Sequence, residues 1–166
     1  MALRDIVLYP APVLKRRAEP VSEITDLVTQ LIEDLLDTMR ASPATIGLAA
    51  PQIGVPSRCF VMDLTGHPKV PSPHGPIALV DPQVEGSEGH GIAREGCLSV
   101  PDLTANVERA DALILSGLDP GGRERTLELQ GFEARVALHE LDHLEGTLIL
   151  DRATSPSDLF ARKVYR

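Results

Sequence analysis

The stretch VALHELDHLEG, residues 136–146, decides how the rest of the chain must fold. It places His139, Glu140 and His143 in a His-Glu-x-x-His spacing. Residues four apart lie on one face of a helix, one turn apart, so both imidazoles can reach a single metal ion. Glu140 lies about 100° round the helix from His139, where it can contact a water on that metal. Two imidazoles leave such a site incomplete, so another part of the chain must supply a further ligand.

Cys97, within EGCLSVP at residues 95–101, is the candidate for that ligand. A free cysteine is most often a small buried hydrophobic residue, and this interpretation suits Cys59. It suits Cys97 less well, because its segment is not a continuous core run. Two histidines and a cysteine, with a fourth position left to water, form a recognised catalytic arrangement. Two alternatives stay open, namely a protease-like site completed by Glu145 or Asp151 and a buried hydrogen-bond network without metal.

Composition restricts the class of protein. The chain has 166 residues, enough for one domain with a real core, so we expect a single domain over 1–166 with a short C-terminal tail from about 153. The net charge of -8 argues against a general nucleic-acid or membrane-surface binder. No apolar run is long enough to span a bilayer. The N-terminus resembles no signal peptide, because Asp5 interrupts its first apolar stretch, and a cytoplasmic protein is therefore expected.

Two segments have the periodicity of helices. Apolar residues at three- and four-residue intervals over 22–40 predict an amphipathic N-terminal helix with Ser22 as its N-cap. Residues 132–144 carry the metal motif and predict the second helix, and Gly146 follows where a C-terminal cap belongs. One short helix is expected within 155–166. Its basic side chains are expected to be solvated, namely Arg162, Lys163 and Arg166.

The segments between the helices predict strands. Residues 58–63 and 77–81 have the composition of buried strands, and 112–119 with 125–130 predict a hairpin. Residues 84–94 are rich in Gly and Glu and are expected to form a turn. The fold class is therefore α+β, with antiparallel strands packed around the metal-binding helix. Three histidines in loop-like stretches are expected to be solvated: His67, His74 and His90.

Three stretches together resemble the signature motifs of the peptide deformylase family, in the family's order. They are IGLAAPQIGV at 46–55, EGCLS at 95–99 and HELDH at 139–143. Residues 9–21 and the Asp-Arg pair at 151–152 also resemble that family, so the resemblance covers about residues 4–152. It implies a metal-dependent hydrolase that removes the formyl group from the formyl-methionine of newly made proteins and releases formate.

The resemblance implies a role for each motif residue. Cys97, His139 and His143 would hold the metal, whose bound water becomes a nucleophile near neutral pH. Glu140 would take the water proton and deliver it to the departing amine. The resemblance also assigns two donors to the oxyanion: the side-chain amide of Gln52 and the backbone N–H of Leu98. Taken alone, Gln52 would be interpreted as an exposed turn residue.

The substrate site follows from the same resemblance. The methionine side chain would lie against an apolar wall formed by Ile46, Phe132 and Val136. An extended peptide could pair as an added strand with the segments around Gly47 and Gly96. An alternative for the three apolar residues is ordinary core. The expected cofactor is one divalent metal per chain, with Fe²⁺ as the family's usual ion and Zn²⁺, Ni²⁺ or Co²⁺ as alternatives.

The expected partners are N-formyl-methionyl nascent peptides, with transient proximity to the ribosome and no direct nucleic-acid specificity. Three positions depart from the family's common pattern. Thr45 stands where the first motif usually has Gly, Leu138 where Gln usually precedes the first histidine, and Asp81-Pro82 where Asn-Pro is common. Thr45 keeps open a catalytically weak or inactive paralogue that only binds peptide. A peptidase acting on unformylated peptides is the other alternative.

Overall fold

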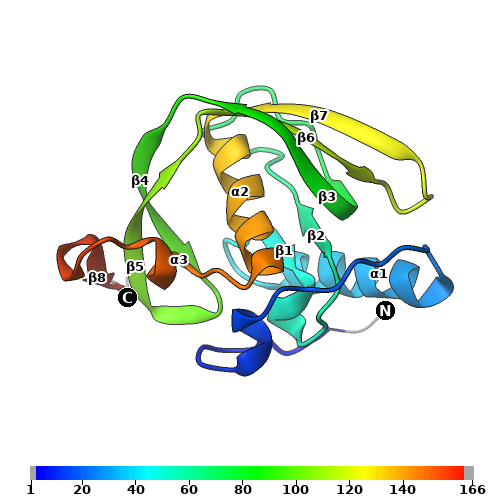
Figure 1. Cartoon of the computed structure of the whole chain (residues 1–166), viewed down its shortest axis with the longest axis horizontal. Helices are drawn as coiled ribbons and strands as arrows, with labels where there is room; N and C mark the ends of the chain where they lie inside the picture. The colour runs from blue at the N-terminus through cyan, green and yellow to red at the C-terminus, as the bar shows by residue number, and fades with distance from the viewer. Residues whose placement is uncertain (1–2, 163–166) are drawn as a thin grey trace.

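Two antiparallel sheets enclose one central helix, α2, in the computed structural model, which describes residues 3–162 (Figure 1). The helix covers Gly131–Glu145. The larger sheet has the order β1-β2-β3-β6-β7, with bounds Gly47–Ala49, Cys59–Met62, Ile77–Glu88, Ala112–Leu118 and Glu124–Gln130. The smaller sheet has the order β4-β5-β8, with bounds Gly91–Cys97, Val100–Arg109 and Leu159–Ala161. The predicted α+β class, with antiparallel strands around the motif helix, is confirmed.

Short helical turns and one long helix complete the fold. The long helix is α1, and the short elements are η1 Pro12–Lys15, η2 Ala50–Ile53, α3 Ile149–Arg152 and η3 Pro156–Asp158. Within residues 3–162 no helix is both long and apolar enough to cross a membrane. The predicted hairpin is confirmed as β6 and β7, which pair from Ala112 with Gln130 to Leu118 with Glu124.

The start of α1 differs from the prediction. The helix covers Asp26–Ala41, and its N-cap is Thr25 rather than Ser22. Ser22 has a φ of 67°, outside the helical region, and its N–H donates to the Asp81 carboxylate at 3.1 Å. The side chain of Asp81 therefore ties this residue into a turn before the helix can begin. The apolar face of α1 packs beside β1 and β2, through Leu31, Ile32, Leu35 and Met39.

The turn predicted over 84–94 is wrong. β3 continues to Glu88, and β4 begins at Gly91. The pairing of β3 with β6 has two register shifts, and the first, between Val80 and Gln83, accommodates Pro82. The actual turn is short and lies at Gly89, whose φ is 71°. β3 and β4 thus lead directly from one sheet into the other, which carries Cys97 round to the central helix (Figure 1).

The C-terminal segment also differs from the prediction. A three-residue turn, η3, takes the place of the expected helix, and β8 then pairs with β5 from Leu103 to Ala105. Pairing with β5 satisfies more of the backbone N–H and C=O groups of this segment than one isolated helical turn could. Lys163 and Arg166, which were expected to be solvated, lie outside the described residues.

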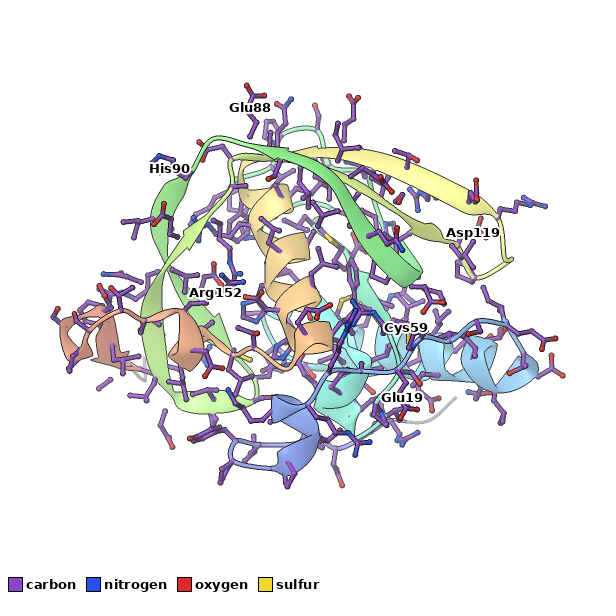
Figure 2. The ribbon with its side chains drawn as sticks, in the orientation of Figure 1. Glu19, Cys59, Glu88, His90, Asp119 and Arg152 are labelled. Atoms are coloured by element: carbon purple, nitrogen blue, oxygen red, sulfur yellow. The ribbon has the colours of Figure 1, made fainter. Side chains whose placement is uncertain are left out.

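The core lies on both sides of α2. Figure 2 shows side chains filling the space between this helix and the sheets, with Cys59 deep within the molecule. Cys59 is fully buried, as expected of a structural cysteine. The predicted cap at Gly146 is confirmed, with a φ of 75°. A Cβ there would lie 2.8 Å from backbone atoms of Lys15, so Gly146 is needed both to end the helix and to admit the N-terminal arm.

Candidate metal centre

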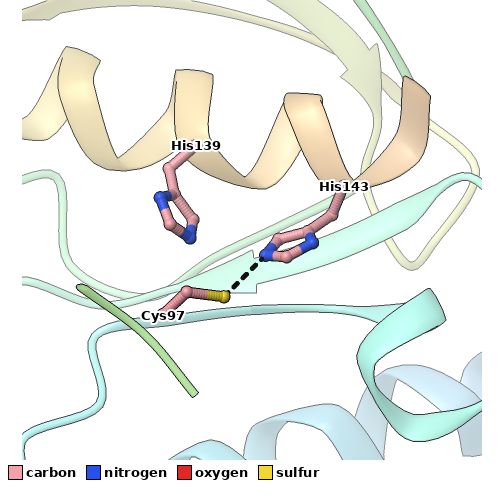
Figure 3. A group of neighbouring side chains, drawn as sticks. All are labelled: Cys97, His139 and His143. Atoms are coloured by element: carbon pink, nitrogen blue, oxygen red, sulfur yellow. Dashed lines mark hydrogen bonds between the residues drawn. The ribbon is translucent and has the colours of Figure 1, made fainter. Parts of the chain in front are cut away.

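The structure brings Cys97, His139 and His143 together at one point between β4 and α2 (Figure 3). The two histidines project from successive turns of the helix, and the cysteine is the last residue of the strand. Their ligand atoms all lie within 4.8 Å of one another. The Cys97 sulfur lies 3.4 Å from Nε2 of His143. Three metal-ligand atoms, from two segments far apart in the sequence, therefore lie close enough to bind one ion, as the motifs predicted.

These donors fit a small divalent metal. Bond lengths typical of zinc, about 2.3 Å to sulfur and 2.0–2.1 Å to nitrogen, place sulfur and nitrogen about 3.5 Å apart in a tetrahedron. The separation between Cys97 and His143 is close to that value. A thiolate with two imidazoles is a donor set for zinc or a neighbouring transition metal rather than for magnesium or calcium. Neither Glu145 nor Asp151 joins the cluster, since Glu145 pairs with Arg58 and Asp151 with Lys15.

Glu95 orients the first histidine, a role that the sequence analysis missed. Its Oε1 lies 2.8 Å from Nδ1 of His139, which turns Nε2 of that ring toward Cys97. Arg109 donates to both oxygens of this carboxylate at 2.9 and 3.0 Å, and Arg135 donates at 2.7 Å. Burial alone would raise the pKa of Glu95, but the hydrogen bonds and charges of His139 and Arg109 hold it well below its usual value.

The network continues beyond Arg109. Asp142 accepts a hydrogen bond from Arg109 and two from Arg152, the latter at 2.6 and 3.0 Å. Asp142 is only 7% exposed, so these contacts lie inside the protein. One signal could have pointed to Glu95. Residues two apart in a strand face the same side, so Glu95 shares its side with Cys97.

Glu140 lies buried beside the ligand cluster. Burial raises the pKa of this carboxyl to about 7, so it can accept and release a proton near neutral pH. Within residues 3–162, Oε2 of Glu140 has no hydrogen-bond partner. Its other oxygen lies against β1, where a Cβ on Gly47 would come within 2.7 Å. Gly47 is therefore required by the close approach of the carboxylate.

Gln52 is 2% exposed, so its interpretation as an exposed turn residue is wrong. The N–H of Ala49 donates to its Oε1 at 3.1 Å, which fixes the orientation of the amide. The amide nitrogen then points to the centre, 3.7 Å from the Cys97 sulfur and 3.3 Å from the hydroxyl of Ser99. Ser99 is fully buried and was not singled out from the sequence.

A cavity of about 260 Å³ opens beside this cluster. The residues expected to bind substrate all line it, together with Leu98: Ile46, Gly47, Gly96, Phe132 and Val136. β1 and β4 each lie at the end of their sheet, so among the described residues each has an unpaired edge. Three arginines that the sequence analysis did not connect with the site also line the cavity: Arg94, Arg135 and Arg162.

The expected solvation holds for His90 and in part for His74, whose side chain is 36% exposed, but not for His67. The side chain of His90 is 79% exposed (Figure 2). His67 instead stacks on Phe132 at the cavity wall, with ring centres 4.7 Å apart. His74 lies 2.6 Å from the buried carboxylate of Glu133. Both contacts join the proline-rich loop of residues 66–76 to the start of α2. The composition of the loop does not reveal such tertiary contacts.

Comparison with known proteins places these features in a family. A family model described as polypeptide deformylase matches residues 3–158. A peptide deformylase of Thermodesulfovibrio yellowstonii is 40% identical over 164 residues, covering 98% of this chain and 97% of the relative. One of Halothermothrix orenii is 43% identical over 141 residues, covering 85% of this chain and 87% of the relative.

Solved structures agree with the sequence relatives. The crystal structure of peptide deformylase from Thermotoga maritima superposes with a TM-score of 0.84 at 35% identity, covering 93% of this chain and all of that one. The enzyme from Ehrlichia chaffeensis gives a TM-score of 0.87 at 30% identity, covering 94% of this chain and 90% of that one. With its three motifs folded into one centre and relatives matched over nearly their full length, the chain belongs to the polypeptide deformylase family.

Proposed function

We propose that this protein is a peptide deformylase that removes the formyl group from the N-terminal formyl-methionine of newly synthesised proteins. One observation carries the proposal. Cys97, His139 and His143 converge beside the buried carboxyl of Glu140, at a cavity bordered by two unpaired strand edges. A hydrolase of a linear formamide needs a nucleophile, a site for the oxyanion and a proton for the amine, and the residues around this cavity can supply each of them.

The chain's own residues divide the work as follows. A divalent metal on the three ligands supplies Lewis acidity for the formyl carbonyl and for water. Glu140 accepts the proton of the attacking water as the carbon–oxygen bond forms. Gln52 and the backbone N–H of Leu98 donate to the oxygen that becomes negative. The carbon–nitrogen bond then breaks, Glu140 passes its proton to the amine nitrogen, and formate and a free methionyl N-terminus are released.

The substrate binds as an added strand in this proposal. The edges of β1 and β4 offer backbone groups on both sides of the cavity, at Gly47 and Gly96. The methionine side chain lies against Ile46, Phe132 and Val136. The formyl group carries only hydrogen beyond its carbonyl carbon, so the space that it needs beside the metal ligands is small.

Neither Thr45 nor Leu138 favours an inactive paralogue. Thr45 lines the cavity, but its hydroxyl turns back to the carbonyl of Pro43 at 3.3 Å. Leu138 packs against the main hydrophobic cluster. Both side chains leave the three ligands and Glu140 in place.

Several finer features belong to the same proposal. The metal in the cell is Fe²⁺, with Zn²⁺, Ni²⁺ or Co²⁺ as substitutes that the same donors accept. The protein acts in the cytoplasm as a single catalytic domain, on nascent chains as they leave the ribosome, without sequence-specific contact to nucleic acid. Its net charge of -8 is consistent with the last point.

The test is release of formate from formyl-Met-Ala-Ser by protein purified without oxygen, with the bound metal counted. We expect formate from the wild type and a loss of about 10²–10⁴-fold in Glu140→Ala at equal metal content. Glu128→Ala, a change on an exposed side chain of β7, is the matched control and should keep full activity. Bound metal without formate would contradict the proposal, and cleavage of unformylated Met-Ala-Ser would favour a peptidase.

A further inference from the structure

Two exposed arginines lie at the rim of the cavity. Arg94 lies on β4 and Arg162 directly follows β8, and both side chains are exposed and line the cavity. Within residues 3–162, no carboxylate oxygen lies within 4.0 Å of either guanidinium. Arg135, the third arginine of the cavity, is paired with Glu95.

Contacts with the C-terminal strand, β8, position both arginines. The N–H of Arg162 donates to the carbonyl of Asp102 at 2.9 Å, which extends the pairing of β8 with β5. Its guanidinium then lies over Gly96, where a Cβ would be 3.4 Å from the nearest nitrogen. The guanidinium carbon of Arg94 lies 3.3 Å from the centre of the Phe160 ring. Stacking on an aromatic face restrains this side chain without neutralising its charge.

The position along β4 relates these arginines to the substrate. Gly96 directly precedes Cys97 on β4. Arg94 lies three residues before Cys97, which is about 10 Å at the rise of a strand. If a peptide is added along the β4 edge with its formyl group at the metal ligands, its second and third residues come opposite Arg162 and Arg94. This step rests on the proposed function.

We propose that Arg94 and Arg162 select formylated peptides with Asp or Glu as the second or third residue. Nε of Arg94 donates to the side-chain carbonyl of Asn106 at 3.5 Å, which leaves its terminal nitrogens for a ligand. The terminal nitrogens of a guanidinium bind a carboxylate through two parallel hydrogen bonds and bind neutral side chains less well. The same groups could instead donate to backbone carbonyls, and rates would then be independent of the peptide's charge. Both arginines are exposed, and no carboxylate among residues 3–162 competes for them, which favours the charged partner.

The test compares formylated tripeptide amides, because a C-terminal amide removes the other carboxylate. Each peptide is formyl-Met-Ala-Xaa-amide or formyl-Met-Xaa-Ala-amide, with Asp, Asn or Lys at Xaa. We expect kcat/KM of the wild type to favour Asp over Asn by about five-fold at one or both positions, and Lys to be the poorest. The preference should shrink as salt is raised from 20 to 500 mM, because salt screens exposed charges, with a Debye length of about 10 Å at 0.1 M.

Variants assign the preference to residues. Arg94→Gln and Arg162→Gln should each reduce the ratio of Asp to Asn, and the double variant should bring it to about one. Arg162→Lys should keep part of the preference, and Arg162→Glu should move it toward the Lys peptide. Arg123→Gln, at the tip of the β6–β7 hairpin, is the matched control and should keep the wild-type ratio. Each rate is divided by the same variant's rate on formyl-Met-amide, which corrects for any general loss of metal or fold.

The possible failures are distinguishable. If even the wild type releases no formate from any peptide, the proposed function fails. Calorimetric binding of the deformylated peptides Met-Ala-Asp-amide and Met-Ala-Asn-amide then still measures the preference without turnover. An unchanged ratio of Asp to Asn in the double variant would overturn the inference. So would an equal fall of the normalised rate on the Asp, Asn and Lys peptides, which would assign the arginines to the peptide backbone.

Discussion

The carboxylate of Glu95 accepts a hydrogen bond from Nδ1 of His139 across the gap between β4 and α2, at 2.8 Å. This contact requires the proton of the neutral ring to be on Nδ1 and leaves the Nε2 lone pair for a metal. Glu95 lies two residues before Cys97, so one short strand supplies one ligand and orients another. The geometry of the centre therefore depends on a residue outside the three ligands.

Weaker metal binding is expected for Glu95→Gln. The amide loses the charge that stabilises the imidazole as a metal ligand, and loss of such a contact typically weakens metal affinity by about 10–100-fold. Competition with a chelator, monitored by metal content, measures the effect. Glu108→Gln is the matched control, because its carboxylate is exposed beside His90. Equal metal affinities in the two variants would contradict the role assigned to Glu95.

A Gln52→Met variant should lose turnover while it keeps its metal. Methionine has a similar shape but lacks the N–H groups that point to the centre, and loss of one such donor costs about 10²–10³-fold in kcat. The assay is formate release, accompanied by metal analysis. Gln83→Met, on the exposed part of β3, should behave as the wild type. A rise in KM alone, at constant kcat, would argue against a donor to the oxyanion.

The two cysteines should differ in their reaction with iodoacetamide. Burial raises the pKa of the Cys59 thiol to about 12, so only about one molecule in ten thousand is thiolate there at pH 8. Cys97 lines the cavity. We expect one alkylated thiol per chain after metal removal, none in metal-free Cys97→Ser, and two after denaturation of the wild type. Peptide mapping identifies the modified residue, and label on Cys59 in the folded protein would contradict this assignment.

Replacement of the glycine at the end of α2 should reduce the stability of the protein more than replacement of a glycine in a turn. Gly146→Ala and Gly122→Ala both place a Cβ at a positive φ, which costs about 1–2 kcal/mol. Only at Gly146 would the new carbon also lie 2.8 Å from the backbone of Lys15, whereas nothing lies within 4 Å at Gly122. Urea unfolding of the two variants should therefore show the larger loss of stability for Gly146→Ala. Equal losses would mean that the N-terminal arm moves aside without cost.

Sequence patterns predicted the structural features that are set by residues close together in the chain. The two histidines share a face because they are four residues apart, and Gly146 ends α2 because it can adopt a positive φ. The long extension of β3 was missed because its Gly- and Glu-rich composition resembles a turn, while the register shifts that carry the strand past Pro82 depend on pairing with β6. The roles of Glu95 and Arg162 depend on contacts between distant segments, and no local periodicity encodes such contacts.

The direct passage of β3 into β4 has a mechanical consequence. The two rims of the cavity, β1 and β4, belong to different sheets, and Gly89 lies in the short turn between the sheets. Cys97 comes from the small sheet and both histidines come from the helix that packs on the large one, so an ion held by all three joins the two halves of the molecule. The width of the peptide cleft would thus depend on the occupancy of the metal, because an ion bound by both sides would fix the distance between the two walls.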